Sequence, residues 1–150
     1  MPVQTEHRFP PGLSVLDAAG SRVTLAGLRG QARAVAVSFM RTGTCPACIQ
    51  HARALARPDL PTHGGQPVAV VPGPPAHAAR VRRILGDRVT VVSSAGAQAH
   101  LAAGLHRTLL LQHSGIMLVD SAGVVRYRPV TALPTGSLGG PTLQAAIDQL

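Results

Sequence analysis

Short apolar runs and longer amphipathic stretches follow one another along the chain. Residues 32–40 and 67–71 are apolar on both faces, which is typical of strands buried inside a sheet. The stretches 46–57 and 74–86 are rich in helix formers, start near a proline and stop at a proline or glycine, so they predict helices. The segment 88–93 predicts another strand. Because strands and helices alternate, we expect crossover connections and a sheet that is at least partly parallel.

Hairpin signals stand near both ends of the chain. Residues 9–16 and 21–25 predict short strands around the turn DAAG, and Gly30 then ends a helical turn. Residues 115–120 and 124–130 predict two strands around the turn SAG. Two further helices are predicted at 95–105, N-capped by Ser93 or Ser94 and closed by Gly104, and at 142–150, where Leu143, Ala146, Ile147 and Leu150 share one face.

The length of the chain fits one domain. A chain of 150 residues can bury roughly 68–70% of its unfolded surface in one core without disulfide support. No repeat, long linker or change of composition divides it. The sequence therefore predicts a single α/β domain over residues 1–150.

The charge is strongly basic, which raises the question of a nucleic-acid partner. The chain has fourteen basic and six acidic residues, which gives a net charge of +8. All fourteen are arginine, spread from Arg8 to Arg128 with a cluster at Arg80, Arg82 and Arg83. Only 2% of the residues are aromatic, so the stacking platforms of single-strand binders are missing. We therefore do not expect nucleic acid as the partner.

The compartment expected from the sequence is the cytoplasm. No basic segment followed by an apolar run resembles an export signal, and no apolar run is long enough to span a bilayer. No membrane partner is expected. In a reducing compartment, two closely spaced cysteines are more often catalytic or metal-binding than structural.

The two cysteines of the chain, Cys45 and Cys48, follow the predicted strand 32–40 directly and stand at the start of the predicted helix 46–57. Free backbone N–H groups and the positive end of the helix dipole converge there, which favours a thiolate at Cys45. Cys48 lies one turn later on the same face, within reach of a disulfide with Cys45. The pattern C-P-A-C thus supplies an attacking thiol and a second thiol to resolve the intermediate.

Two other interpretations of this pair remain open. The cysteines could be inert core residues, although their spacing at a strand-to-helix turn argues against chance. They could bind structural zinc with His51 as a third ligand, although no second paired motif is present. The fourth ligand would then come from His77, His100, His106 or His113.

The segment FPPGLSVLDAAGSRVTLAGLRGQARAVAVSFMRTGTCPAC, from Phe9 to Cys48, resembles the peroxiredoxin-like AhpC/TSA superfamily, in the branch that carries C-P-x-C. GIMLVDSAGVVRYRPV, from Gly115 to Val130, is similar to the late hairpin of that superfamily. The resemblance implies a thioredoxin-like three-layer α/β fold, in which a central mixed sheet is flanked by helices and preceded by an N-terminal β-hairpin.

The resemblance also assigns roles to four residues. Cys45 would be the attacking or peroxidatic thiolate and Cys48 the resolving cysteine. Thr42 occupies the threonine position of the T-x-x-C motif, where its hydroxyl would bind the thiolate or the peroxide. Arg41 would stabilise the thiolate by its charge.

The chain departs from the superfamily at three positions. Ser38 stands where peroxiredoxins carry the first proline of their motif. Ser114 or Gly115 stands where thioredoxins have a cis-proline and typical peroxiredoxins an arginine. Phe39 replaces the buried acid of thioredoxins, so a base would be His51, His113 or water.

These observations predict an enzyme, a thiol peroxidase or a thiol-disulfide oxidoreductase. Its substrate would be a small hydroperoxide or a disulfide, and turnover would pass through a Cys45–Cys48 disulfide. No bound cofactor or metal is expected, because an external low-molecular-weight thiol or thioredoxin-type protein would supply the electrons. A homodimer is compatible with this function. The alternative is a binding module on the same scaffold whose cysteines sense oxidation or metal without turnover.

Overall fold

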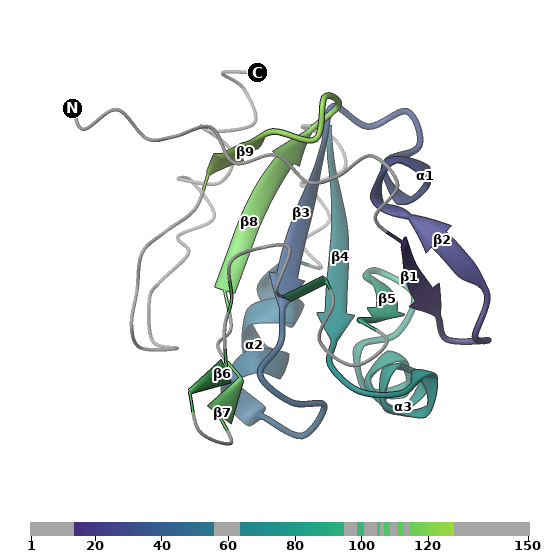
Figure 1. The fold of residues 1–150 in the computed structure, drawn as a ribbon, viewed down its shortest axis with the longest axis vertical. Helices are drawn as coiled ribbons and strands as arrows, with labels where there is room; N and C mark the ends of the chain where they lie inside the picture. Colours follow the sequence, from purple (N-terminus) through teal and green to yellow (C-terminus); the bar gives the residue numbers. More distant parts are fainter. Residues whose placement is uncertain are drawn as a thin grey trace.

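The computed structural model describes residues 14–55, 64–94, 99–100, 105, 107–108, 111–112 and 115–127. Within them, one mixed sheet has the strand order β2-β1-β5-β4-β3-β8-β9 (Figure 1). Its strands are β1 (Ser14–Asp17), β2 (Arg22–Thr24), β3 (Ala34–Phe39), β4 (Gly65–Val71), β5 (Thr90–Ser93), β8 (Gly115–Asp120) and β9 (Val125–Tyr127). The helices are α1 (Leu25–Arg29), α2 (Pro46–Leu55) and α3 (Pro75–Leu85).

Parallel pairing in the centre of the sheet confirms the predicted crossovers. β3 pairs in parallel with β4, and β4 with β5. β8 runs antiparallel to β3, and β1 antiparallel to β5. The carboxyl ends of β3, β4 and β5 therefore meet at one edge, the lower edge in Figure 1, and α2 and α3 start from it.

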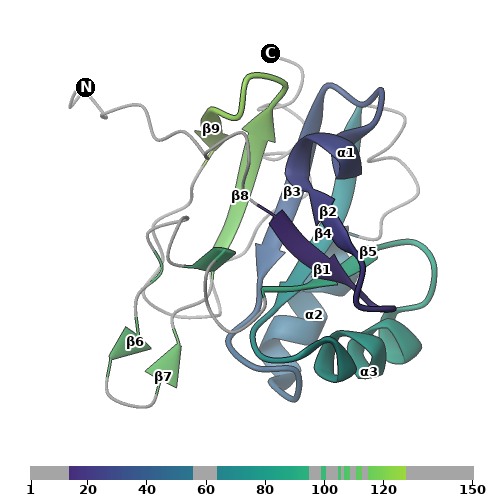
Figure 2. The same cartoon turned by 45° about the vertical axis from the view of Figure 1, so that its right-hand side comes forward.

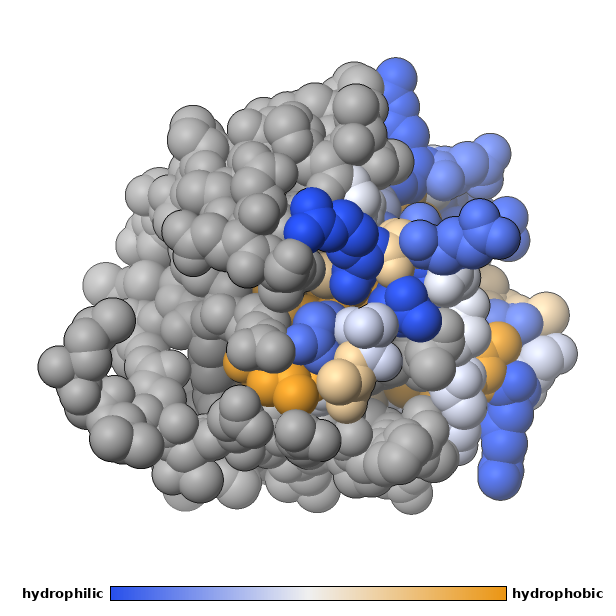
Figure 3. Space-filling view, turned by 90° about the horizontal axis from the view of Figure 1, so that it is seen from above, coloured by the Kyte–Doolittle hydropathy of each residue, from blue (hydrophilic) through white to orange (hydrophobic). Residues whose placement is uncertain are grey.

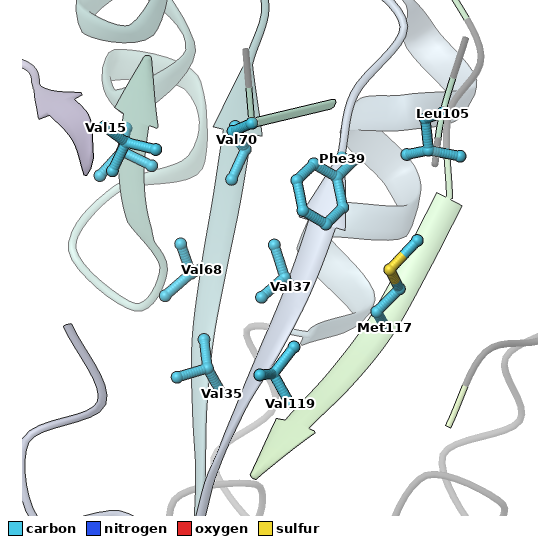
Figure 4. Close-up of a cluster of buried hydrophobic side chains, with 11 residues drawn as sticks. Val15, Val35, Val37, Phe39, Val68, Val70, Leu105, Met117 and Val119 are labelled. Atoms are coloured by element: carbon cyan, nitrogen blue, oxygen red, sulfur yellow. The ribbon is translucent and has the colours of Figure 1, made fainter. Parts of the chain in front are cut away.

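Two hydrophobic clusters form the core, one on each face of the sheet. Successive side chains of a strand point to opposite faces, so central strands need apolar residues at nearly every position. All six residues of β3 are buried. The cluster shown in Figure 4 lies on the face turned away from α2 and contains Val15, Val35, Val37, Phe39, Val68, Val70, Val92, Ala99, Leu105, Met117 and Val119.

The second cluster packs α2 and α3 against the other face, and Figure 2 shows both helices beside the lower part of the sheet. It contains Met40, Cys48, Ala52, Ala69, Val71, Ala78, Val81, Val89 and Val91. One of the two cysteines is therefore part of the core. Among the described residues, no helix has the length and apolarity needed to cross a membrane.

Local signals explain the N-terminal hairpin and the first helix. Asp17 Oδ1 accepts the backbone N–H groups of Ala19 and Ser21 at 2.9 and 2.8 Å, which closes the turn between β1 and β2. Thr24 caps α1 by accepting the N–H of Gly27 at 3.1 Å. The hairpin and the mixed sheet confirm the expected thioredoxin-like α/β fold.

A few elements differ from the pattern-based prediction. β4 starts at Gly65, two positions before the predicted strand, and β5 starts at Thr90 rather than at residue 88. β6 (Arg107–Thr108) and β7 (Leu111–Gln112) form a separate antiparallel pair that was not predicted, because two-residue strands show no alternation. Ala99 and His100 are helical, as predicted for 95–105. The predicted helix at 142–150 lies outside the described residues.

Candidate functional site

The connection from β3 to α2 places the cysteines. β3 ends at Phe39, and the next residue, Met40, still donates its N–H to the Val70 carbonyl of β4 at 2.9 Å. The chain then turns, and α2 starts at Pro46, whose missing N–H is not needed in a first helical turn. The predicted strand-to-helix junction is thus confirmed.

Cys45 occupies the capping position of α2 and is half-buried. Its carbonyl accepts the N–H of Ile49 at 3.1 Å, the first bond of the helical series. Its Sγ accepts the N–H of Cys48 at 3.3 Å, in the manner of an N-cap side chain. Both an N–H donor and the helix dipole therefore favour negative charge on this sulfur.

Cys48 lies inside the first turn of α2 and is only 2% exposed. Its Sγ accepts the backbone N–H of Arg41 at 3.3 Å. Burial, followed by a hydrogen bond with the Cys45 side chain, raises the pKa of Cys48 to about 11. Cys48 is therefore a protonated thiol at neutral pH, in direct contact with the sulfur of Cys45, and both cysteines are free.

Arg41 and Thr42 lie in the turn before Cys45. The positive charge of Arg41 lowers the pKa of Cys48, although burial outweighs it. Its Nε atom is buried and has no hydrogen-bond partner among the described residues. The Thr42 hydroxyl accepts the N–H of Thr44 at 3.3 Å and lies 3.3 Å from the Thr44 hydroxyl. In this structure Thr42 thus organises the turn, and a role toward peroxide stays a prediction.

Ser38 occupies the position of the superfamily's proline. It lies in the middle of the sheet, where it pairs with Ala69 on one side and Ile116 on the other. Proline lacks the N–H that a strand with two neighbours needs for its ladder. Ser38 keeps the N–H that proline would remove from this central strand.

The histidines predicted as a base or as zinc ligands lie in different environments. His51 is half-buried on α2, whereas His77 is exposed on α3. His106, His113 and Ser114 lie outside the described residues. Among the described residues, no group of three or more His, Cys, Asp or Glu side chains could hold a metal ion.

His100 is the residue whose place the sequence did not reveal. It is fully buried, with Nε2 2.8 Å from the Met40 carbonyl oxygen and Nδ1 3.2 Å from the Ser94 hydroxyl. Both ring nitrogens thus have protein partners. The sequence signal for it is a histidine within the mostly apolar predicted helix 95–105.

The arginines are not concentrated at the cysteines. Exposed ones occur on β2, before β3, on α2, on α3 and before β5: Arg22, Arg33, Arg53, Arg80, Arg82, Arg83 and Arg88. On the face seen in Figure 3, strongly hydrophilic residues stand in several groups with paler and hydrophobic residues between them. The exposed arginines of the described residues are thus spread over several elements.

Several solved structures share this fold. A peroxiredoxin-like protein from Aquifex aeolicus superposes with a TM-score of 0.77 at 14% identity, over 98% of this chain and 87% of that chain. A peroxidoxin from Mycobacterium tuberculosis gives a TM-score of 0.74 at 15% identity, over 97% and 99% of the two chains. A hypothetical protein from Sinorhizobium meliloti gives a TM-score of 0.72 at 21% identity, over 99% of this chain and 84% of that chain.

No family model matches the chain, and a search of curated proteins found no match. At these identities, the superpositions establish the shared fold. The chemistry of the site has to be argued from its own residues.

Proposed function

We propose that this protein is a thiol peroxidase of the peroxiredoxin type, in which Cys45 reduces a hydroperoxide and Cys48 resolves the product. The observation that carries the proposal is the unequal environment of two touching thiols. Cys45 is half-buried and caps a helix, whereas Cys48 is buried with a pKa raised to about 11. One sulfur is therefore accessible and suited to negative charge, and the other is held as a thiol beside it.

The first step uses Cys45 alone. Its thiolate attacks one peroxide oxygen, an S–O bond forms, and the O–O bond breaks. Cys45 becomes a sulfenic acid, and the other oxygen leaves as an alcohol or water after it takes up a proton. The N–H of Cys48, 3.3 Å from Cys45 Sγ, stabilises the thiolate before this attack.

The second step joins the two cysteines. Cys48 sulfur attacks the sulfenic sulfur of Cys45, an S–S bond forms and the S–O bond breaks. The hydroxyl group leaves with the Cys48 proton as water. Two thiol groups from an external low-molecular-weight thiol or a thioredoxin-type protein then reduce the disulfide, so the cycle needs no bound cofactor.

Known structures of similar fold support peroxide reduction as the activity. Proteins of similar fold include a thiol peroxidase from Chromobacterium violaceum and a Xanthomonas campestris protein described for alkyl peroxide reduction. In this chain, Arg41 would add positive charge near the sulfurs, and a cytoplasmic, reducing compartment would supply the thiol.

Disulfide reduction is the second candidate, and the position of Thr42 favours it. The Thr42 hydroxyl accepts the N–H of Thr44 and lies against the Thr44 hydroxyl, so both of its contacts among the described residues are within the turn. In this reaction Cys45 would attack a substrate disulfide to form a mixed disulfide, and Cys48 would release it.

Reaction of the reduced protein with one equivalent of hydrogen peroxide tests the proposal. We expect both thiols to disappear within one rapid reaction and the intact mass to fall by two hydrogens. Cys45→Ser is the matched control and should consume no peroxide. If wild-type protein keeps both thiols but reduces a small disulfide, the second candidate replaces the first.

A further inference from the structure

The peptide unit between Met40 and Arg41 has both of its polar groups bound to functional side chains. Its carbonyl oxygen lies 2.8 Å from His100 Nε2. Its N–H donates to Cys48 Sγ at 3.3 Å. One rigid peptide plane therefore connects a buried histidine to the thiol that would resolve the intermediate.

The partners of His100 determine which ring nitrogen carries the proton. A carbonyl oxygen can only accept, so Nε2 must be the protonated nitrogen. The Ser94 oxygen accepts the N–H of Ala99 at 3.0 Å, which leaves its own hydroxyl proton to donate to Nδ1 at 3.2 Å. The result is a neutral imidazole whose two nitrogens are both satisfied.

Packing holds this ring in one orientation. His100 is fully buried, and its ring meets the edge of Phe39 at a centroid distance of 5.3 Å and an angle of 74°. Ser94 is tied to β4, because its N–H donates to the Val71 carbonyl at 2.9 Å. The ends of β3, β4 and β5 thus fix the histidine that binds the Met40 carbonyl.

We propose that His100 is a positioning residue for Cys48, acting through the Met40–Arg41 peptide; this deepens the proposed function and rests on it. When Cys48 attacks the sulfenic acid of Cys45, its sulfur loses a proton and the Arg41 N–H stabilises the developing charge. His100 holds that N–H in line with the sulfur. Its donation to the same peptide also polarises the N–H and strengthens the bond to sulfur.

Three variants separate positioning from simple core packing. His100→Phe keeps an aromatic ring against Phe39 but has no donor. His100→Gln can place an amide N–H near the position of Nε2 and is the conservative rescue. His77→Gln changes an exposed histidine on α3 and serves as the control.

Rapid mixing with one equivalent of hydrogen peroxide, quenched and analysed by intact mass, resolves both steps. In His100→Phe, we expect sulfenic acid to form at the wild-type rate and the disulfide to form roughly three- to tenfold more slowly, as for one lost hydrogen bond. His100→Gln should recover most of the rate, and His77→Gln should match wild type. An unchanged second step in a folded His100→Phe, or equal slowing in His100→Phe and His100→Gln, would overturn the proposal.

A second measurement does not depend on peroxide chemistry. Nitrogen NMR of the reduced wild-type protein should show the proton of His100 on Nε2, and the Arg41 amide proton should shift upfield in His100→Phe and return in His100→Gln. A proton on Nδ1, or an unmoved Arg41 amide, would reject the positioning role even if no sulfenic acid forms. If no sulfenic acid forms but the Arg41 amide shifts as expected, only the proposed peroxidase activity is rejected, and the positioning of the Arg41 N–H by His100 stands.

Discussion

The backbone N–H of Cys48 donates to Sγ of Cys45 across 3.3 Å, so one cysteine caps the helix in which the other is buried. The two sulfurs touch but differ in exposure and in hydrogen-bond partners. This asymmetry arises from ordinary helix geometry, because residues three apart in a first turn share one face. It also means that stability and reactivity depend on the same sulfur atom.

Removal of the cap should cost stability. Cys45→Ala leaves the Cys48 N–H without its side-chain acceptor and should lower the free energy of unfolding by about 1 kcal/mol. Cys45→Ser keeps a good capping atom and should stay within a few tenths of a kcal/mol of the reduced wild type. Urea unfolding of the reduced proteins, followed by circular dichroism, measures both. Equal stability of the two variants would show that the sulfur does not cap the helix.

The two cysteines should fail in different ways when replaced. Cys45→Ser should lose all peroxide consumption, because the accessible sulfur is gone. Cys48→Ser should consume one equivalent and stop, with one oxygen added to Cys45 as sulfenic acid. Intact mass after a peroxide pulse, with and without a sulfenic-acid trap, checks this. Loss of the first step in both variants, with no adduct, would make the pair a structural unit.

Most of the fold could be predicted from the sequence because the central strands are buried on both faces. The continuous apolar run of β3 and the proline and glycine residues around α3 give strong local signals. The starts of strands were less well predicted. Gly65, for example, has no side chain to extend the apolar pattern, and it belongs to β4 because its backbone pairs with Ala34. The pair β6 and β7 is too short to show a period.

The site was only partly predictable for a related reason. The spacing of Cys45 and Cys48 fixes their helical relationship, so their contact could be expected. The contact between His100 and Met40 joins residues sixty positions apart, and no local pattern reports it. The turn role of the Thr42 hydroxyl depends on side-chain geometry that sequence spacing does not specify.

Acid should destabilise the protein through His100. Burial lowers the pKa of His100 from 6.5 to about 4, so the folded state favours the neutral ring. In the unfolded chain, His100 binds a proton below pH 6.5, whereas in the folded chain it binds one only below about pH 4. Stability should therefore be fully present above pH 6.5 and fall by at most about 1.4 kcal/mol per pH unit as the pH drops toward 4.

The comparison of wild type with His100→Gln isolates this effect, because glutamine does not titrate and the other acidic groups are common to both. Urea unfolding between pH 4 and 7 should show the wild type losing stability relative to His100→Gln as the pH falls below 6.5. Parallel curves would mean that the histidine keeps an ordinary pKa in the folded state.

Arg41 should influence Cys48 through charge. Its guanidinium lowers the pKa of the Cys48 thiol, so Arg41→Gln should raise that pKa further and slow disulfide formation. Arg41→Lys keeps the charge and should stay closer to wild type. The backbone N–H to Cys48 remains in both variants, so the difference between them reports charge alone. The rate of disulfide formation after a peroxide pulse measures this effect. Identical rates in the two variants would show that the charge of Arg41 does not affect Cys48.

Alkaline pH should speed the resolving step. With a pKa of about 11, Cys48 is almost entirely a thiol at neutral pH. As long as the pH stays below that pKa, each increase of one pH unit raises the thiolate fraction about tenfold. If the thiolate attacks the sulfenic acid, the rate of disulfide formation should rise tenfold per unit from pH 7 to 10 without a plateau. The control is Cys48→Ser resolved by an added small thiol, whose rate should level off near that thiol's own, lower pKa. A plateau near pH 8 or below in the wild type would show that Cys48 is not held as the protonated partner. The assignment of Cys48 as the resolving thiol would then rest on its burial and its position in α2 alone.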